Sequence, residues 1–81
     1  MITSQQIRAA RALLKMTSAE LAERSGIGVA TIKRLEVGMG IPPAHAKTLD
    51  QLGQALIKAG VEFIGTPDDG PGVRLVSKKK K

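Results

Sequence analysis

Apolar residues recur every three or four positions through most of the N-terminal part of the chain, which is the period of amphipathic helices. In the first such stretch, Ile7 and Leu14 lie on one helical face. Thr3 and Gln6 precede them in the spacing of a capping box, in which each side chain accepts from the other residue's backbone N–H. The pattern predicts a first helix that begins after Thr3 and runs through Lys15.

A second capping box, formed by Thr17 and Glu20, predicts a helix that begins near Ser18. Gly26 follows the last residue that fits this helix, and a left-handed backbone there costs a residue with a β-carbon roughly 1–2 kcal/mol. Ala22 lies four positions before Gly26 and supplies the small side chain that two closely crossing helices need. The chain is therefore expected to turn sharply at Gly26.

A third helix is predicted from about Val29 to Val37. Residues 17–36 then form a helix, a tight glycine turn and a second helix, in a spacing that lets the second helix lie in a DNA groove. The core that these two helices share is expected to contain Leu21, Ile27, Ile32 and Leu35.

Residues 38–43 contain two glycines and two prolines, so they predict a loop. A fourth helix is expected after this loop and ends at Gly60. Its apolar stripe consists of Leu49, Leu52, Leu56 and Ala59.

The pattern changes after the fourth helix, because residues 61–64 and 73–76 are rich in β-branched and aromatic side chains. Residues 65–72 between them have turn composition throughout. We expect a β-hairpin that Phe63 holds against the helices. An isolated two-stranded hairpin is marginal in water, so it must either pack on the helices or extend across a dimer.

The helix, turn and helix resemble those of the Cro and lambda-repressor-like family, also called the xenobiotic-response-element family of bacterial and phage regulators. The small residue Ala22, the turn residue Gly26 and the apolar positions around them match that family, over about residues 3–60. The resemblance implies a mainly α fold, a four-helix lambda-repressor-like helix-turn-helix domain with a short C-terminal β-hairpin.

We expect residues 1–60 to form the DNA-binding domain and residues 61–76 to form a hairpin extension of it. A chain of 81 residues has room for one modest core. The absence of cysteine is compatible with an intracellular protein, and no segment is apolar enough for a membrane span. Residues 77–81 are expected to be a disordered basic tail, which either raises nonspecific DNA affinity or only aids solubility.

The net charge of +6 says little about DNA binding, because four of the thirteen basic residues lie at positions 78–81. The resemblance implies that the first two turns of the third helix face base edges, and that the start of the second helix meets phosphates or the outermost base. The DNA-binding candidates are Thr17, Ser18, Val29, Ala30, Thr31, Lys33 and Arg34. Lys47 is added to them as a further basic residue.

Arg34 is the strongest of these candidates, because a guanidinium can bind guanine O6 and N7 in two-point fashion. Val29 and Ala30 can only contact thymine methyl groups or sugars, where the family often has polar side chains. Gly28 also replaces the serine or threonine that often caps this helix. Base specificity is therefore expected to depend on Arg34, Thr31 and the shape of the DNA.

The resemblance also implies a structural ion pair. In the family an arginine on the first helix, here Arg11, pairs with a glutamate near the end of the recognition helix, here Glu36. We expect this pair to orient the recognition helix.

The function that we expect is a sequence-specific transcriptional regulator of the bacterial cytoplasm, binding double-stranded DNA as a homodimer. An alternative is a protein-interaction module, such as an antitoxin or an antiactivator, that uses the helix-turn-helix as a scaffold. No arrangement of residues indicates an enzyme or a cofactor site. His45 has no second metal ligand nearby, and Asp68 and Asp69 fit a turn better than a cation site.

Overall fold

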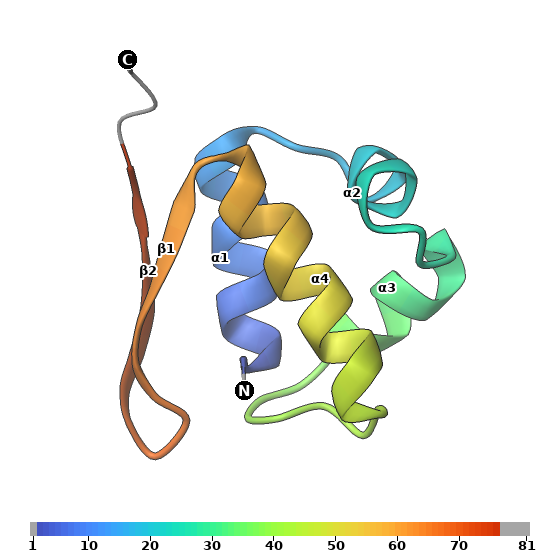
Figure 1. Ribbon diagram of the computed structural model, residues 1–81. Coiled ribbons are helices and arrows are strands. Elements are labelled where there is room, and N and C mark those ends of the chain that lie inside the picture. Colours follow the sequence, from blue (N-terminus) through green and yellow to red (C-terminus); the bar gives the residue numbers. More distant parts are fainter. Residues whose placement is uncertain (1, 77–81) are drawn as a thin grey trace.

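The computed structural model describes residues 2–76, which form four helices followed by an antiparallel hairpin (Figure 1). The mainly α fold with a C-terminal hairpin predicted from the sequence is confirmed. None of the helices among these residues is long and apolar enough to cross a membrane. The elements are α1 (Ser4–Leu14), α2 (Ser18–Ser25), α3 (Val29–Glu36), α4 (Ala46–Ala59), β1 (Val61–Thr66) and β2 (Asp69–Leu75).

Both predicted capping boxes are present at the starts of α1 and α2. At the first, the Gln6 N–H donates to Thr3 Oγ1 over 3.1 Å, and the Thr3 N–H donates to Gln6 Oε1 over 2.9 Å. At the second, Thr17 and Glu20 exchange the same two hydrogen bonds at 2.8 and 3.0 Å. These bonds satisfy N–H groups that a helix start otherwise leaves without partners.

The helix ends differ slightly from the predicted ones. Helix α1 stops at Leu14, because Lys15 takes a left-handed backbone with φ of 53°. Gly26 has φ of 79° and closes α2 as expected, with its N–H donating to Ala22 O over 2.9 Å. Helix α3 ends at Glu36, and Val37 is already extended.

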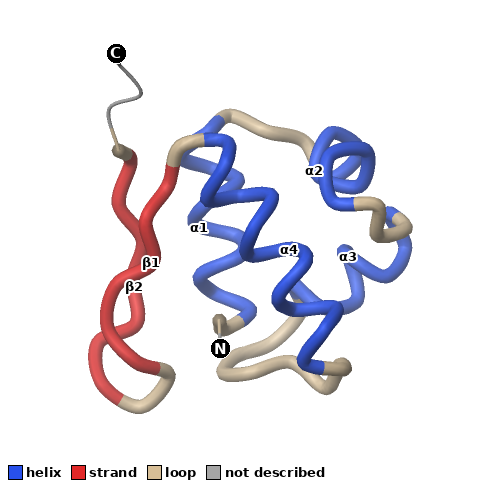
Figure 2. Tube along the Cα trace, in the orientation of Figure 1, coloured by secondary structure: helices blue, strands red, loops and turns tan. Residues whose placement is uncertain are grey.

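A single cluster of buried side chains joins the helices to the hairpin. In Figure 2, α1 and α4 lie in the middle of the molecule, between the hairpin on one side and α2 with α3 on the other. Phe63 and Val73 of the hairpin are partly buried and pack against this core, so the hairpin lies on the helices. The buried core residues are Ile7, Ala10, Met16, Leu21, Ile32, Leu35, Leu49, Leu52, Ala55, Leu56 and Val61.

The expectation that residues 65–72 are turn throughout was wrong. Strand pairing continues to Thr66 and Asp69, so only Pro67 and Asp68 lie between the strands. Gly65 and Gly70 have φ of 75° and 64°, and the register shifts between Ile64 and Thr66. Positive φ at glycine lets the strands absorb this irregularity and remain paired. The prediction for residues 77–81 concerns residues outside those that the structure describes.

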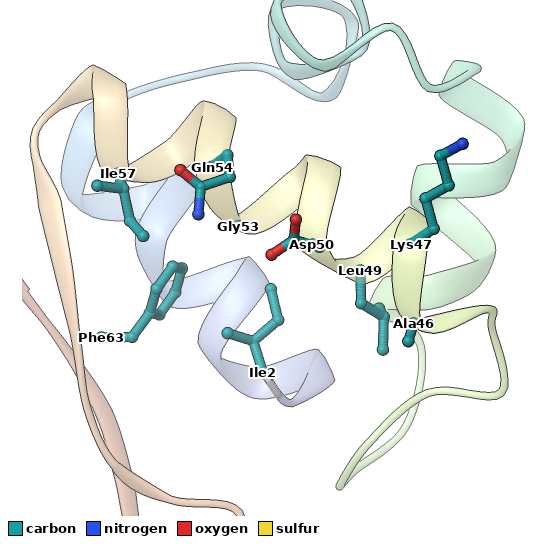
Figure 3. Close-up of a pocket in the computed structure, with 9 residues that line it drawn as sticks. All are labelled: Ile2, Ala46, Lys47, Leu49, Asp50, Gly53, Gln54, Ile57 and Phe63. Carbon is teal, nitrogen blue, oxygen red and sulfur yellow. The ribbon is translucent and has the colours of Figure 1, made fainter.

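Gly53 is a glycine in the middle of α4 that the fold does not require. It lies on the floor of a shallow groove, close to Ile2 and Phe63 (Figure 3). A β-carbon at this position would meet only the Ile2 side chain, at an ordinary 3.8 Å. A glycine inside a helix costs about 0.5–1 kcal/mol relative to alanine, because its unfolded backbone has more freedom.

Replacing Gly53 by alanine should therefore stabilise the protein by about 0.5–1 kcal/mol. The measurement is the free energy of unfolding from urea denaturation, with Gln54→Ala as the control, because Gln54 lines the same groove but is exposed. The control should change stability by less than about 0.5 kcal/mol. A loss of stability in Gly53→Ala would mean that the groove cannot take the extra methyl group.

Candidate nucleic-acid interface

Helix α3 buries one side and leaves the other side open. Ile32 and Leu35 lie in the core, which fixes the rotation of the helix about its axis. On the opposite side Ala30, Lys33 and Arg34 are exposed. A short helix with a buried stripe and an open face beside a tight turn is the arrangement that enters a DNA groove.

The remaining sequence candidates differ in their exposure. Val29, at the start of α3, leaves 40% of its surface accessible, and Thr31 is half-buried. Thr17 is exposed and Ser18 half-buried at the start of α2. Lys47 is exposed in the first turn of α4, and its side chain extends away from the groove drawn in Figure 3.

A depression joins α3 to the start of α4. Thr31 and Arg34 line it from α3, and His45 and Thr48 line it from the start of α4. His45 is exposed just before α4, and Gly28, the residue before α3, provides no side-chain cap. The open face of α3 therefore continues into a depression to which α3 contributes Arg34 and the start of α4 contributes the His45 imidazole and the Thr48 hydroxyl.

The guanidinium of Arg34 on the open face of α3 forms no ion pair with another described residue. Within residues 2–76, the ion pairs are Arg11 with Glu36 and Arg74 with Glu62, so Arg34 belongs to neither.

The pKa of the Glu20 carboxyl is lowered, first by the backbone hydrogen bond from Thr17 and then by the Thr17 hydroxyl. The carboxylate form that closes the α2 capping box is thus favoured.

Arg11 and Glu36 form the two-point ion pair that the resemblance implied. Arg11 Nε lies 2.6 Å from Glu36 Oε2, and Nη2 lies 2.8 Å from Oε1. Arg11 Nη1 also donates to the Met16 carbonyl over 2.9 Å. The Arg11 pKa is raised, mainly by its hydrogen bond to Glu36. The pair therefore links α1, the segment before α2 and the last residue of α3.

Sequence reasoning missed a second set of bonds that holds the end of α3 against α1. The Ser4 hydroxyl donates to the Leu35 carbonyl over 2.6 Å. Arg8 Nη1 donates to the Glu36 carbonyl and, over 3.0 Å, to the Gly38 carbonyl. Arg8 is an ordinary polar residue in the helical pattern, and its partners are carbonyls that any sequence provides, so no local signal marks it.

Residues 7–56 match the family model for the helix-turn-helix, which covers more than half of the chain. The match runs from α1 through α2 and α3 into α4, and so includes the open face of α3. A comparison with curated proteins gives no match. The chain belongs to the helix-turn-helix family of DNA-binding regulators.

Proposed function

We propose that this chain is a sequence-specific transcriptional regulator that places α3 in the major groove of double-stranded DNA. The observation that carries the proposal is the exposed Arg34, held on a helix whose opposite side is locked into the core by Ile32 and Leu35. We further assign the protein to the xenobiotic-response-element branch of the family and to the bacterial cytoplasm.

The side chains around α3 suggest distinct roles. Arg34 would bind a guanine through O6 and N7, and Thr31 would contact a neighbouring base. Val29 and Ala30 would touch thymine methyl groups. Lys33 would also face a base edge. Thr17 and Ser18 would meet phosphates or the outermost base, and Lys47 is proposed as a further basic contact to DNA.

We propose that the protein works as a homodimer on a two-fold site. Helix α3 has only 8 residues, so one copy reads few base pairs. Two copies on half-sites about 34–36 Å apart are the usual solution for this motif. In each copy, residues 1–60 and the hairpin of residues 61–76 would act as one domain, because Phe63 and Val73 share the core of the helices.

Arg34→Ala tests the proposed function. It should weaken binding to the duplex from upstream of the protein's own gene by about 5- to 150-fold, the equivalent of about 1–3 kcal/mol. Fluorescence anisotropy measures this at near-physiological salt, with a scrambled duplex for comparison. Lys58→Ala is the control, because it also removes an exposed cation but lies in the last turn of α4. Equal losses in both variants would indicate a general charge effect.

The second candidate function is a protein-interaction module, such as an antitoxin or an antiactivator. It is favoured by the apolar start of α3, where Val29 and Ala30 are exposed and offer DNA no hydrogen bonds. Weak binding of equal strength to the native and the scrambled duplex would favour this function over the first.

A further inference from the structure

His45 is the only histidine of the chain, and it lies beside the recognition helix. It directly precedes α4 and lines the same depression as Thr31 and Arg34 of α3. The first turn of α4 lies next to α3 (Figure 1). His45 and Arg34 therefore line one depression from two different parts of the fold.

The backbone of His45 is held on both sides. Its carbonyl accepts from the Thr48 N–H over 3.0 Å and from the Leu49 N–H over 3.2 Å, in the first turn of α4. The segment that leads to it from α3 is tied to α1, because the Gly40 N–H donates to Gln5 Oε1 over 2.8 Å. His45 thus has a fixed place relative to α3, and a partner has only its side chain to order.

The imidazole of His45 is exposed and available to a partner. Among residues 2–76 it takes part in no hydrogen bond that caps α4 and in no ion pair. The other residues that line the depression come from α3, from the segment before α4 and from α4 itself, and among them Arg34 alone carries a charge. Lys47, two positions along the chain, is a further exposed cation. A proton on the imidazole therefore adds a positive charge that no carboxylate lining the depression neutralises.

The width of a DNA groove decides what His45 would face. An α-helix with its side chains is about 10–12 Å across, and the major groove of B-DNA is about 12 Å wide. A helix in the groove fills it from side to side, so a residue that flanks the helix meets the phosphates along the edge of the groove. With Arg34 directed at base edges, His45 is such a flanking residue.

We propose that His45 is a further DNA contact, and that its protonation makes the affinity for DNA depend on pH. This inference rests on the proposed function. The neutral imidazole can donate one hydrogen bond to a phosphate, whereas the protonated form donates with a positive charge.

The direction of the pH dependence follows from linkage. A histidine side chain gains its proton between about pH 8 and pH 5, and a neighbouring phosphate favours the protonated form. Binding to DNA then takes up a proton at His45, so a higher proton concentration strengthens binding. The affinity is expected to rise as the pH falls.

Fluorescence anisotropy with the full-length protein tests the proposal. The probe is a duplex enriched from a random pool by the unmodified protein at pH 7, with a scrambled duplex for comparison. The unmodified protein should bind the enriched duplex roughly fivefold more tightly at pH 5.5 than at pH 8.0, as one exposed charge contact would give. The slope of log affinity against log salt should also steepen by about 0.9 at the lower pH, the value for one more neutralised phosphate.

Three variants assign the pH dependence to His45. His45→Gln keeps a polar side chain that cannot be charged, so it should lose the difference between the two pH values. His45→Arg is charged at both, and it should bind at pH 8.0 as tightly as the unmodified protein does at pH 5.5. Lys47→Gln is the matched control, because it removes a neighbouring exposed cation but should keep the fivefold difference.

The outcomes separate this inference from the proposed function. A pH difference that persists in His45→Gln would overturn the inference, because another group would then be titrating. Equal affinity of the unmodified protein at pH 5.5 and 8.0 would also overturn it, and preference for the enriched over the scrambled duplex would leave the proposed function standing. If no duplex is enriched or bound at either pH, the proposed function and this inference both fail.

Discussion

Replacing Glu36 by alanine should lower the free energy of unfolding by about 3 kcal/mol, because it leaves the Arg11 guanidinium in a partly buried site without its carboxylate. The two side chains keep only 9% and 24% of their surfaces accessible. The loss should appear in urea denaturation and as a Tm lower by roughly 15 °C, since each kcal/mol shifts the Tm of a small domain by about 4–8 °C.

Glu62→Ala is the matched control for this prediction. Glu62 pairs with Arg74 over 2.7 Å, nearly the same distance as in the Arg11–Glu36 pair, but both side chains are more than half exposed. Exposed ion pairs contribute about 0–1 kcal/mol, so the control should lose less than about 1 kcal/mol. Equal losses in the two variants would show that burial does not set the contribution of the Glu36 pair.

The Glu36 substitution should also weaken DNA binding at temperatures where the variant stays folded. Glu36 is the last residue of α3, and its carboxylate ties that end of the helix to Arg11 on α1. Without this bond, α3 loses part of its fixed orientation, and the proposed contact of Arg34 with a base edge depends on that orientation. Glu62→Ala should leave DNA binding unchanged, because Glu62 and Arg74 lie on the hairpin.

Replacing Gly65 by alanine should be the most damaging single change in the hairpin. A β-carbon there would lie 2.1 Å from the Gly70 carbonyl oxygen, and the backbone φ of 75° is itself unfavourable for alanine. The left-handed backbone costs roughly 1–2 kcal/mol and the overlap costs a further 1–3 kcal/mol. We therefore expect a loss of about 2–5 kcal/mol, or local detachment of the hairpin if that is less costly.

Gly70→Ala is the control for the overlap. Gly70 also has a positive φ, of 64°, but an added β-carbon would meet nothing within 4 Å. This variant should lose only the roughly 1–2 kcal/mol of the backbone conformation. Amide hydrogen exchange of β1 and β2 distinguishes local detachment from global unfolding. If both variants lost the same free energy of unfolding, the overlap between the added β-carbon and the Gly70 carbonyl would contribute nothing to the loss in Gly65→Ala.

Much of the helical part could be predicted because its signals are local. The capping residues Thr3 and Thr17 lie three positions from their partners, and Gly26 follows directly on the helix that it ends. The hairpin was harder to delimit. Glycine, proline and aspartate favour turns in general, and only the pairing of Thr66 with Asp69 shows that most of these residues belong to strands.

The candidate site was predictable where the family pattern is specific. The positions on α3 follow from the helical period, and Arg34 and Lys33 are exposed as that period requires. Arg8, Gln5 and the Ser4 hydroxyl were not anticipated. Their partners are backbone groups of the segment around the end of α3, which carry no sequence signature.

By itself, the sequence determined the helix starts, the tight turn and the face of α3 that stays open, because each depends on residues within a few positions of one another. Only the tertiary structure decided how the hairpin and the segment after α3, residues 37–44, are fixed. Gln6 Nε2 donates to the Gly72 carbonyl over 2.8 Å, across 66 positions, and Arg8 reaches Gly38 across 30. Such bonds form only after packing has brought distant segments together, so no local pattern in the chain can specify them.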